Sequence, residues 1–186
     1  MIITLASASP RRKELIAKIK GVEATVIPAE GEENALFINA GQFACALARG
    51  KAEEVFRKAG GTVLGADTVV VLDGKPLGKP KNRQNAIEML QSLSGRTHSV
   101  ITGVCVINAK KLICRFCETQ VTVDKLDGEF IEKYVSTGSP MDKAGAYGLQ
   151  DAAFGEKVTS VNGDADNVIG LPVAMIEGIL KENFNG

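Results

Sequence analysis

Tryptophan is absent from this chain, and histidine occurs only once. Aromatic residues make up 5% of the 186 residues, and the formal net charge is zero. Proteins that bind single-stranded nucleic acid combine a basic groove with aromatic side chains on which bases stack. Attraction to a phosphate backbone also depends on an excess of Lys and Arg. The composition therefore argues against a nucleic-acid-binding module, and any basic site must be a local cluster.

Long apolar runs are also missing. No stretch approaches the ~20 apolar residues that a membrane-spanning helix needs. The segment Ala6-Ser7-Ala8 resembles a signal cleavage site, but it lacks the charged leader and the apolar core that precede one. Among the four cysteines, Cys114 and Cys117 have C-x-x-C spacing in a strand pattern, which places them on opposite faces. We expect a cytoplasmic protein with structural cysteines and no membrane contact.

The order of apolar patterns predicts a mixed α/β protein. Strand patterns occur at 2–5, 22–27, 62–72, 97–107, 111–123 and 157–161, the third being interrupted at 65–68. Helical patterns occur at 11–19, 40–59, 82–93, 127–136 and 171–180, with Asn82 and Asp127 as caps. Turn residues at 73–74 and 108–110 predict hairpins, which within such an alternation indicate a mixed sheet.

Residues 6–12 join the first strand pattern to the first helical pattern. Ser9 is suited to the N-cap, and Pro10 to the first helical position. Arg11 and Arg12 then occupy a first turn, where acidic residues are preferred. Hydroxyls, backbone N–H groups and guanidinium groups in one place are typical of a phosphate site. The alternative is an ordinary capped helix whose arginines point to solvent.

Asp67 is an acid within an apolar run, where burial without a partner is costly. Its neighbours Gly65 and Ala66 are small and would leave room for a ligand. The functional interpretation is a general base or a metal-binding carboxylate. The alternative is a turn aspartate that is hydrogen-bonded to the local backbone.

Three further segments carry polar residues of interest. Lys79 is held by the following proline and suits a phosphate charge, although an exposed turn lysine is the alternative. Within the glycine-rich stretch 142–150, the Gln150 amide could read the edge of a base, or the stretch is an ordinary surface loop. For Lys51 the default is a solvated helix face, and for His98 a packed or edge position.

Together these segments resemble the Maf family of nucleoside triphosphate pyrophosphatases over most of the chain. The matching motifs are S-x-S-P-R-R at 7–12, L-A-x-x-K-A at 47–52, G-A-D-T-V-V at 65–70, G-K-P at 78–80, H-x-V-x-T-G-V at 98–104, D-K-A-G-A-Y-G-x-Q at 142–150 and N-V-x-G-L-P at 167–172. Several places depart from the family pattern. The acidic loop after Pro28 is spaced unlike that pattern, and residues 162–166 are an atypical approach to Asn167. Ser139 replaces the glutamate that is frequent in T-G-E-P, and Asp151 stands where glycine is common.

The resemblance implies one Maf-like domain over 1–186, with an elongated, twisted mixed sheet flanked by helices. It also implies an ITPase-like fold with two lobes and a central nucleotide cleft, and a homodimer. The implied activity is hydrolysis of dTTP and UTP, extended to modified pyrimidine triphosphates, to monophosphate and pyrophosphate with Mg²⁺ or Mn²⁺. The alternatives are the same chemistry on another base such as 7-methyl-GTP, or a non-catalytic nucleotide-binding regulator of cell division.

The resemblance also assigns roles to individual residues. Asp67 is the implied catalytic residue, acting as a base or through the metal. The implied phosphate ligands are Ser7, Ser9, Arg12, Lys51 and Lys79. The implied specificity residues are Arg11, Thr68 and Gln150. The metal ligands would be Asp67 and Glu32, with Glu30 and Glu33 as alternatives to Glu32.

Overall fold

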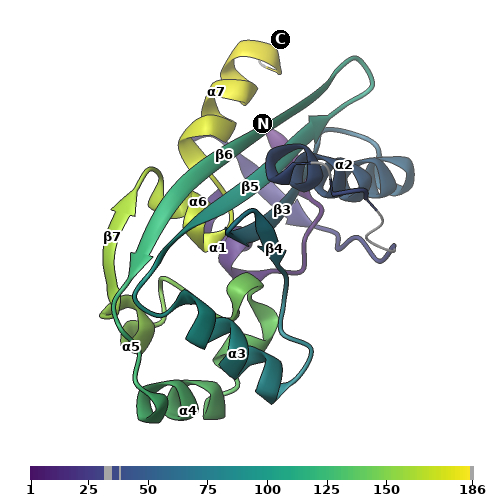
Figure 1. Ribbon diagram of the computed structural model, residues 1–186. Helices are drawn as coiled ribbons and strands as arrows, with labels where there is room; N and C mark the ends of the chain where they lie inside the picture. The colour runs from purple at the N-terminus through teal and green to yellow at the C-terminus, as the bar shows by residue number, and fades with distance from the viewer. Residues whose placement is uncertain (32–34, 38, 185–186) are drawn as a thin grey trace. The chain divides into compact units, whose positions relative to one another are not determined.

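Figure 1 shows the computed structural model of the chain, in which residues 1–31, 35–37 and 39–184 are described. These residues form two compact units. Unit 1 comprises Met1–Thr68, Ile101–Cys117 and Asp166–Gly186. Unit 2 comprises Val69–Val100 and Glu118–Ala165. Each unit is therefore assembled from segments that are far apart in the sequence.

The strands form a seven-stranded mixed sheet in the order β2-β1-β3-β5-β6-β7, with β4 paired to β3. Their bounds are Ile2–Leu5 (β1), Glu23–Val26 (β2), Val63–Leu72 (β3), Lys75–Leu77 (β4), Thr97–Ile107 (β5), Leu112–Val123 (β6) and Val158–Asn162 (β7). Strand β1 is parallel to β2 and β3, whereas β4 is antiparallel to β3 and β7 is antiparallel to β6. The predicted mixed α/β class is confirmed.

The helices are α1 (Pro10–Ile16), α2 (Ala40–Ala59), α3 (Arg83–Leu93), α4 (Gly128–Ser136), α5 (Ala152–Gly155), α6 (Ala165–Ile169) and α7 (Val173–Asn183), with short 3-10 turns at η1 (Ser139–Asp142) and η2 (Ala144–Ala146). Asn82 and Asp127 cap α3 and α4 as predicted, each accepting a backbone N–H three residues on. Helices α5 and α6 are too short to produce a periodic apolar pattern, so the sequence did not predict them.

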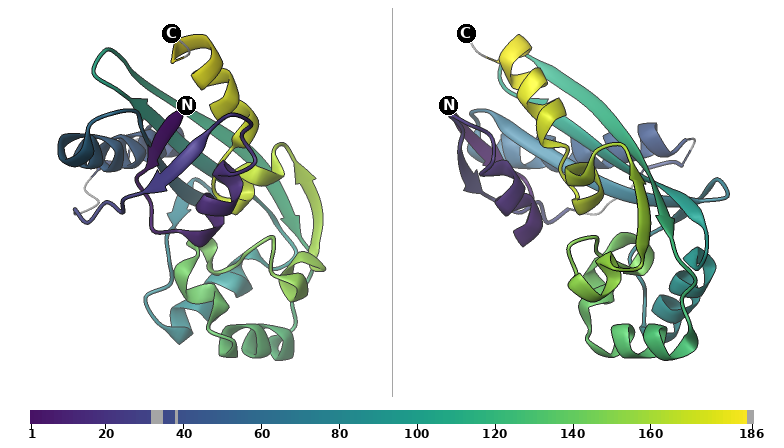
Figure 2. Two further views of the ribbon diagram at one scale, coloured as in Figure 1. Left: turned by 180° about the vertical axis from the view of Figure 1, so that it is seen from behind. Right: turned by 90° about the vertical axis from the view of Figure 1, so that its left-hand side faces the viewer.

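Unit 1 buries both faces of its strands. Because successive strand residues point to opposite faces, Leu64 and Val104 pack with α1 and α7, whereas Val63 and Cys105 pack with α2. The right-hand view of Figure 2 shows α1 and α7 on one side of the strands and α2 on the other. This layering places the first turn of α1 and the middle of α2 near β3, where the candidate site residues lie.

Unit 2 is organised around an aromatic cluster. Phe154 is fully buried, and its ring lies 5.1 Å from that of Tyr134 and 4.6 Å from that of Tyr147. Phe130 stacks on Tyr134 with 6.0 Å between the ring centroids. The cluster therefore joins α4 to the segment that leads from η2 into α5.

Two expectations from the sequence concern membrane-spanning segments and the state of the cysteines. Among the described residues, no helix is both long enough and apolar enough to cross a bilayer. All four cysteines are free, and Cys105 is fully buried.

Candidate functional site

Arg12 gathers several predicted site residues in unit 1. Its Nη1 donates to Ser7 Oγ at 3.3 Å, and its Nη2 donates to Thr68 Oγ1 at 3.1 Å. Its Nε donates to the Gly170 carbonyl at 2.9 Å. Because the guanidinium is planar and its donors are fixed in a fork, these contacts hold it in one orientation. Ser7, Arg12 and Thr68 therefore form one cluster, called here the arginine cluster.

A buried hydrogen-bond chain supports the arginine cluster. Thr102 Oγ1 lies 2.9 Å from Thr68 Oγ1 and donates to the Asn167 carbonyl at 2.9 Å. Since that hydroxyl has only one proton, it accepts from Thr68, whose hydroxyl in turn accepts from Arg12. The side-chain oxygen of Asn167 also accepts from Thr102 N–H at 3.1 Å, and both residues are fully buried. Their supporting role was missed, although both lie in the family motifs.

The helix start at Ser9 differs from the predicted cap. Ser9 occupies the N-cap and Pro10 follows it, as predicted, but the Ser9 side chain makes no capping hydrogen bond. Its N–H instead donates to Ser7 Oγ at 3.2 Å. Helix α1 has only seven residues, so the case for an anion site rests on Arg12 more than on the helix dipole. Arg11 lies in the same first turn and is partly exposed.

Lys51 and Asp67 form a close ion pair in unit 1. Lys51 Nζ donates to Asp67 Oδ1 at 2.6 Å, and the two side chains are 18% and 12% exposed. Asp67 lies inside strand β3, so the alternative of a turn aspartate is wrong. The solvated-face alternative for Lys51 is also wrong. The ammonium satisfies a carboxylate that would be costly to bury alone.

The predicted interruption of the third strand is wrong, and the reason lies in Gly65. Strand β3 is continuous through 65–68. A Cβ on Gly65 would lie 2.1 Å from the Ala48 carbonyl oxygen and 2.8 Å from Ala52 N. The small residue therefore makes room for helix α2 and not for a ligand. Since Asp67 shares the face of Gly65, this close approach brings Lys51 within reach of it.

Lys79 and Gln150 belong to unit 2, and both are exposed. The Gly145 N–H donates to the Gly78 carbonyl at 3.0 Å. Pro80, next to Lys79, is buried. The lysine turn is therefore anchored to the glycine-rich stretch that carries Gln150.

Only part of the predicted metal set falls on described residues. Glu32 and Glu33 lie outside them, and Glu30 Oε2 lies 3.4 Å from Lys58 Nζ. Across residues 1–31, 35–37 and 39–184, no group of three or more His, Cys, Asp or Glu side chains could hold a metal ion. Mg²⁺ is usually bound by one or two carboxylates together with substrate phosphates and water. Asp67 alone fits that requirement as a single protein ligand.

His98 is a packed residue, as predicted. It is 3% exposed, and its Nε2 lies 2.7 Å from the Tyr147 hydroxyl. Burial lowers the pKa of His98 to about 4. A neutral, enclosed imidazole of this kind has a structural role.

Comparison with solved structures defines the class of fold. The Ham1 protein of Staphylococcus aureus aligns with a TM-score of 0.59 at 16% identity, covering 98% of this chain and 99% of that one. A HAM1 protein from Coxiella burnetii gives the same TM-score at 14% identity, with 98% and 99% covered. This chain therefore has a Ham1-like fold, which at such low identity leaves the function open.

Within that class, the chain belongs to the Maf-like protein family, whose profile matches residues 2–183. A dTTP/UTP pyrophosphatase of Thermococcus gammatolerans is 46% identical, over 98% of this chain and 97% of its own length. A dTTP/UTP pyrophosphatase of Agathobacter rectalis is 43% identical, over 97% and 96%. The family resemblance predicted from the motifs is confirmed.

Proposed function

We propose that this protein hydrolyses dTTP and UTP to the nucleoside monophosphate and pyrophosphate. The observation that carries the proposal is the Lys51–Asp67 pair at 2.6 Å in a largely buried part of unit 1. In this pair an ammonium group, which we propose binds phosphate, lies beside a carboxylate that we propose acts on water. The near full-length similarity to proteins named for this activity supports the same substrates.

The basic and hydroxyl side chains are proposed to bind the triphosphate. In unit 1 the guanidinium of Arg12 is already oriented by Ser7 and Thr68, and a planar guanidinium suits phosphate oxygens. Lys51 and Ser9 complete this set in unit 1, and Lys79 is the proposed phosphate ligand of unit 2. The positive charges of Arg12 and Lys51 in unit 1 would stabilise the negative charge of the transition state.

The proposed chemical step is attack of water on the α-phosphorus. Asp67 accepts a proton from the water as its oxygen forms the new bond to phosphorus. The bond from the α-phosphorus to the bridging oxygen breaks, and pyrophosphate leaves with that oxygen. Lys51 holds the Asp67 carboxylate in place through its hydrogen bond. A divalent cation, with Asp67 and Glu32 as its proposed protein ligands, supplies charge neutralisation on the phosphates when bound.

Base selection is proposed to depend on Arg11, Thr68 and Gln150. The Gln150 amide both donates and accepts, which suits the alternating acceptors and donor of a uracil or thymine edge. The hydroxyl of Thr68 is engaged with Arg12 and Thr102. Its proposed contribution is therefore to link base selection to the placement of Arg12.

A product assay tests the proposal. The protein is incubated with dTTP, UTP, CTP and purine triphosphates in the presence of Mg²⁺ or Mn²⁺, and pyrophosphate is separated from single phosphate. We expect pyrophosphate from dTTP and UTP. Asp67→Asn should lose at least about a hundredfold in kcat, the range of general-base catalysis, while Asp124→Asn, an exposed carboxylate in unit 2, should keep normal rates. Failure to turn over any triphosphate, or release of single phosphate, would contradict the proposal.

The domain extent, the oligomeric state and the cellular compartment are also proposed, on the basis of the family resemblance. We propose that residues 1–186 act as one functional domain, that the protein is a homodimer and that it works in the cytoplasm. Sedimentation equilibrium at several protein concentrations tests the oligomeric state. A mass equal to one 19.6 kDa chain at all concentrations would remove the dimer from the proposal.

A further inference from the structure

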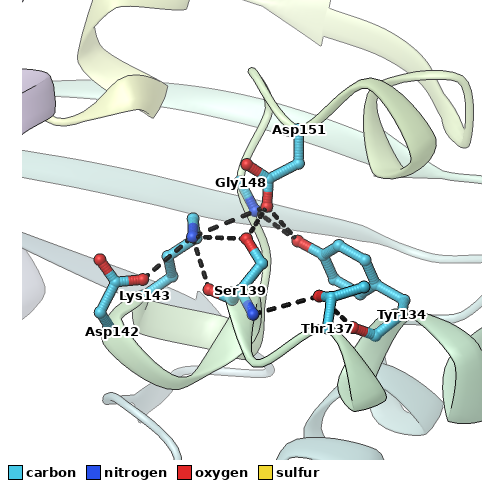
Figure 3. Close-up of polar contacts among 7 residues, drawn as sticks. All are labelled: Tyr134, Thr137, Ser139, Asp142, Lys143, Gly148 and Asp151. Carbon is cyan, nitrogen blue, oxygen red and sulfur yellow. Dashed lines mark hydrogen bonds and ion pairs between the residues drawn. The ribbon is translucent and has the colours of Figure 1, made fainter.

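The carboxylate of Asp151 occupies an unusual place directly after Gln150. Asp151 stands at the N-cap of α5, yet its side chain makes no capping hydrogen bond. Its Oδ2 instead accepts from the Tyr134 hydroxyl at 2.6 Å and from Ser139 Oγ at 2.6 Å. Figure 3 shows these side chains converging from α4, from η1 and from the segment that leads into α5.

The same carboxylate faces a buried ammonium group. The Lys143 side chain is 9% exposed, and its Nζ lies 3.6 Å from Asp151 Oδ2. Lys143 also donates to Ser139 Oγ at 2.9 Å and to Asp142 Oδ1 at 2.9 Å. A buried charge needs partners that offset its lost hydration. Asp142 is 60% exposed whereas Asp151 is 20% exposed, so Asp151 supplies the more enclosed counter-charge.

This network holds the backbone on both sides of Gln150. The Gly148 N–H donates to the Tyr134 hydroxyl at 3.2 Å. The Asp151 N–H donates to the Gly148 carbonyl at 3.1 Å. The four residues 148–151 are thus fixed at their first residue by Tyr134 and at their last by the Asp151 side chain.

The packing around Gly148 connects the network to the Gln150 amide itself. A Cβ on Gly148 would lie 2.7 Å from Lys143 Cε and 2.9 Å from Gln150 Nε2. The Gln150 amide and the Lys143 stem therefore both lie against Gly148.

We propose that Asp151 is a positioning residue that sets the base selectivity of Gln150 toward uracil and thymine nucleotides. Through Tyr134, Ser139 and Lys143 it fixes the backbone of residues 148–151 and so the direction of the Gln150 amide. This inference rests on the proposed function.

The test compares UTP with CTP, which differ at the base edge that an amide would read. The ratio of kcat/KM for UTP to that for CTP is measured for the wild type, Asp151→Asn, Gln150→Ala and the double variant. We expect Asp151→Asn to lower this ratio about tenfold, within the range that a lost hydrogen-bond contact can supply. In the Gln150→Ala background, Asp151→Asn should lower it no further, because Asp151 acts through the amide that this variant lacks. Glu156 is an exposed carboxylate five residues after Asp151, and Glu156→Gln should leave the ratio unchanged.

Tyr134→Phe provides a second variant should Asp151→Asn fold poorly, since it keeps the aromatic packing and removes the hydroxyl that bridges Asp151 and Gly148. It should lower the same ratio, and the Gly148 amide should exchange its hydrogen faster. A loss of folded protein alone would reduce turnover of both nucleotides equally and leave the ratio unchanged. If the wild type prefers UTP to CTP and both variants keep the same ratio, the role proposed for Asp151 is overturned, whereas the proposed function stands. A wild type that hydrolyses neither nucleotide overturns the proposed function and, with it, this inference.

Discussion

At the scale of single residues, the orientation of Arg12 yields the first prediction. Its guanidinium donates to Ser7, Thr68 and the Gly170 carbonyl at once. Lysine keeps the charge but has one compact ammonium that cannot make these contacts together. Arg12→Lys should therefore lower kcat/KM for dTTP by about a hundredfold, as expected for a misplaced binding group. Lys13→Ala, an exposed change one residue away, is the control, and equal rates in the two variants would contradict the prediction.

The Lys51–Asp67 pair yields a prediction about stability. Lys51→Met leaves the Asp67 carboxylate largely enclosed and without its ammonium partner, which should destabilise the fold by about 1–3 kcal/mol after allowance for partial exposure. In Lys51→Met/Asp67→Asn the charge is gone, so the free energy of unfolding should recover much of that loss. Denaturant titration measures both, and the double variant should remain inactive.

A double variant less stable than Lys51→Met would show that the pair carries no buried-charge cost.

Of the two residues in the Lys51–Asp67 pair, only one could be predicted from the sequence. Asp67 could be predicted because an acid in an apolar run is conspicuous. Its partner could not, because the pattern of α2 does not say which residue of which strand its lysine meets.

At the scale of elements, the contact between α2 and β3 depends on Gly65. A methyl group there would lie 2.1 Å from the Ala48 carbonyl oxygen, so Gly65→Ala must push the helix away from the strand. We expect a loss of about 2–4 kcal/mol in stability, at the upper end for overpacking, together with lower activity as Lys51 moves from Asp67. Thermal unfolding and kcat measure the two effects.

Gly50→Ala is the matched control for Gly65→Ala. Gly50 lies within α2, and nothing lies within 4 Å of a Cβ at that position. Alanine is the better helix former by about 0.5–1 kcal/mol, so this variant should be more stable than the wild type. If Gly65→Ala also proved stabilising, the close approach of α2 to β3 would not be required.

Element boundaries followed the sequence wherever local chemistry was decisive. The bounds of α2 and the caps of α3 and α4 match the prediction because the Asn and Asp side chains satisfy helix N–H groups locally. The start of α1 also matched, but its Ser9 hydroxyl does not cap. Strand β3 was predicted as interrupted because Gly65 resembles a break when the helix that packs against it is unknown.

At the scale of the whole molecule, the two units are assembled from discontinuous segments, and local periodicity cannot assign segments to units. The arginine cluster and the hydrogen-bond chain that supports it draw on residues near 7, 68, 102 and 167. The family motifs mark these segments without stating which of them touch. That is why Asn167 and Thr102 appeared as motif residues while their support of Arg12 became visible only in three dimensions.

The stability of the folded chain should depend on pH through His98. Burial lowers its pKa from 6.5 to about 4. Between these values the unfolded chain binds a proton that the folded chain does not, so stability falls as the pH decreases. The full cost below pH 4 is about 3 kcal/mol at 1.36 kcal/mol per pKa unit. The free energy of unfolding is measured at pH 7 and at pH 4 for the wild type and for His98→Gln. The two proteins have the same carboxylates, so the difference between their pH dependences isolates the contribution of His98. The wild type should lose more stability over this range, and parallel losses would show that burial beside Tyr147 does not lower the pKa of His98 in the folded chain.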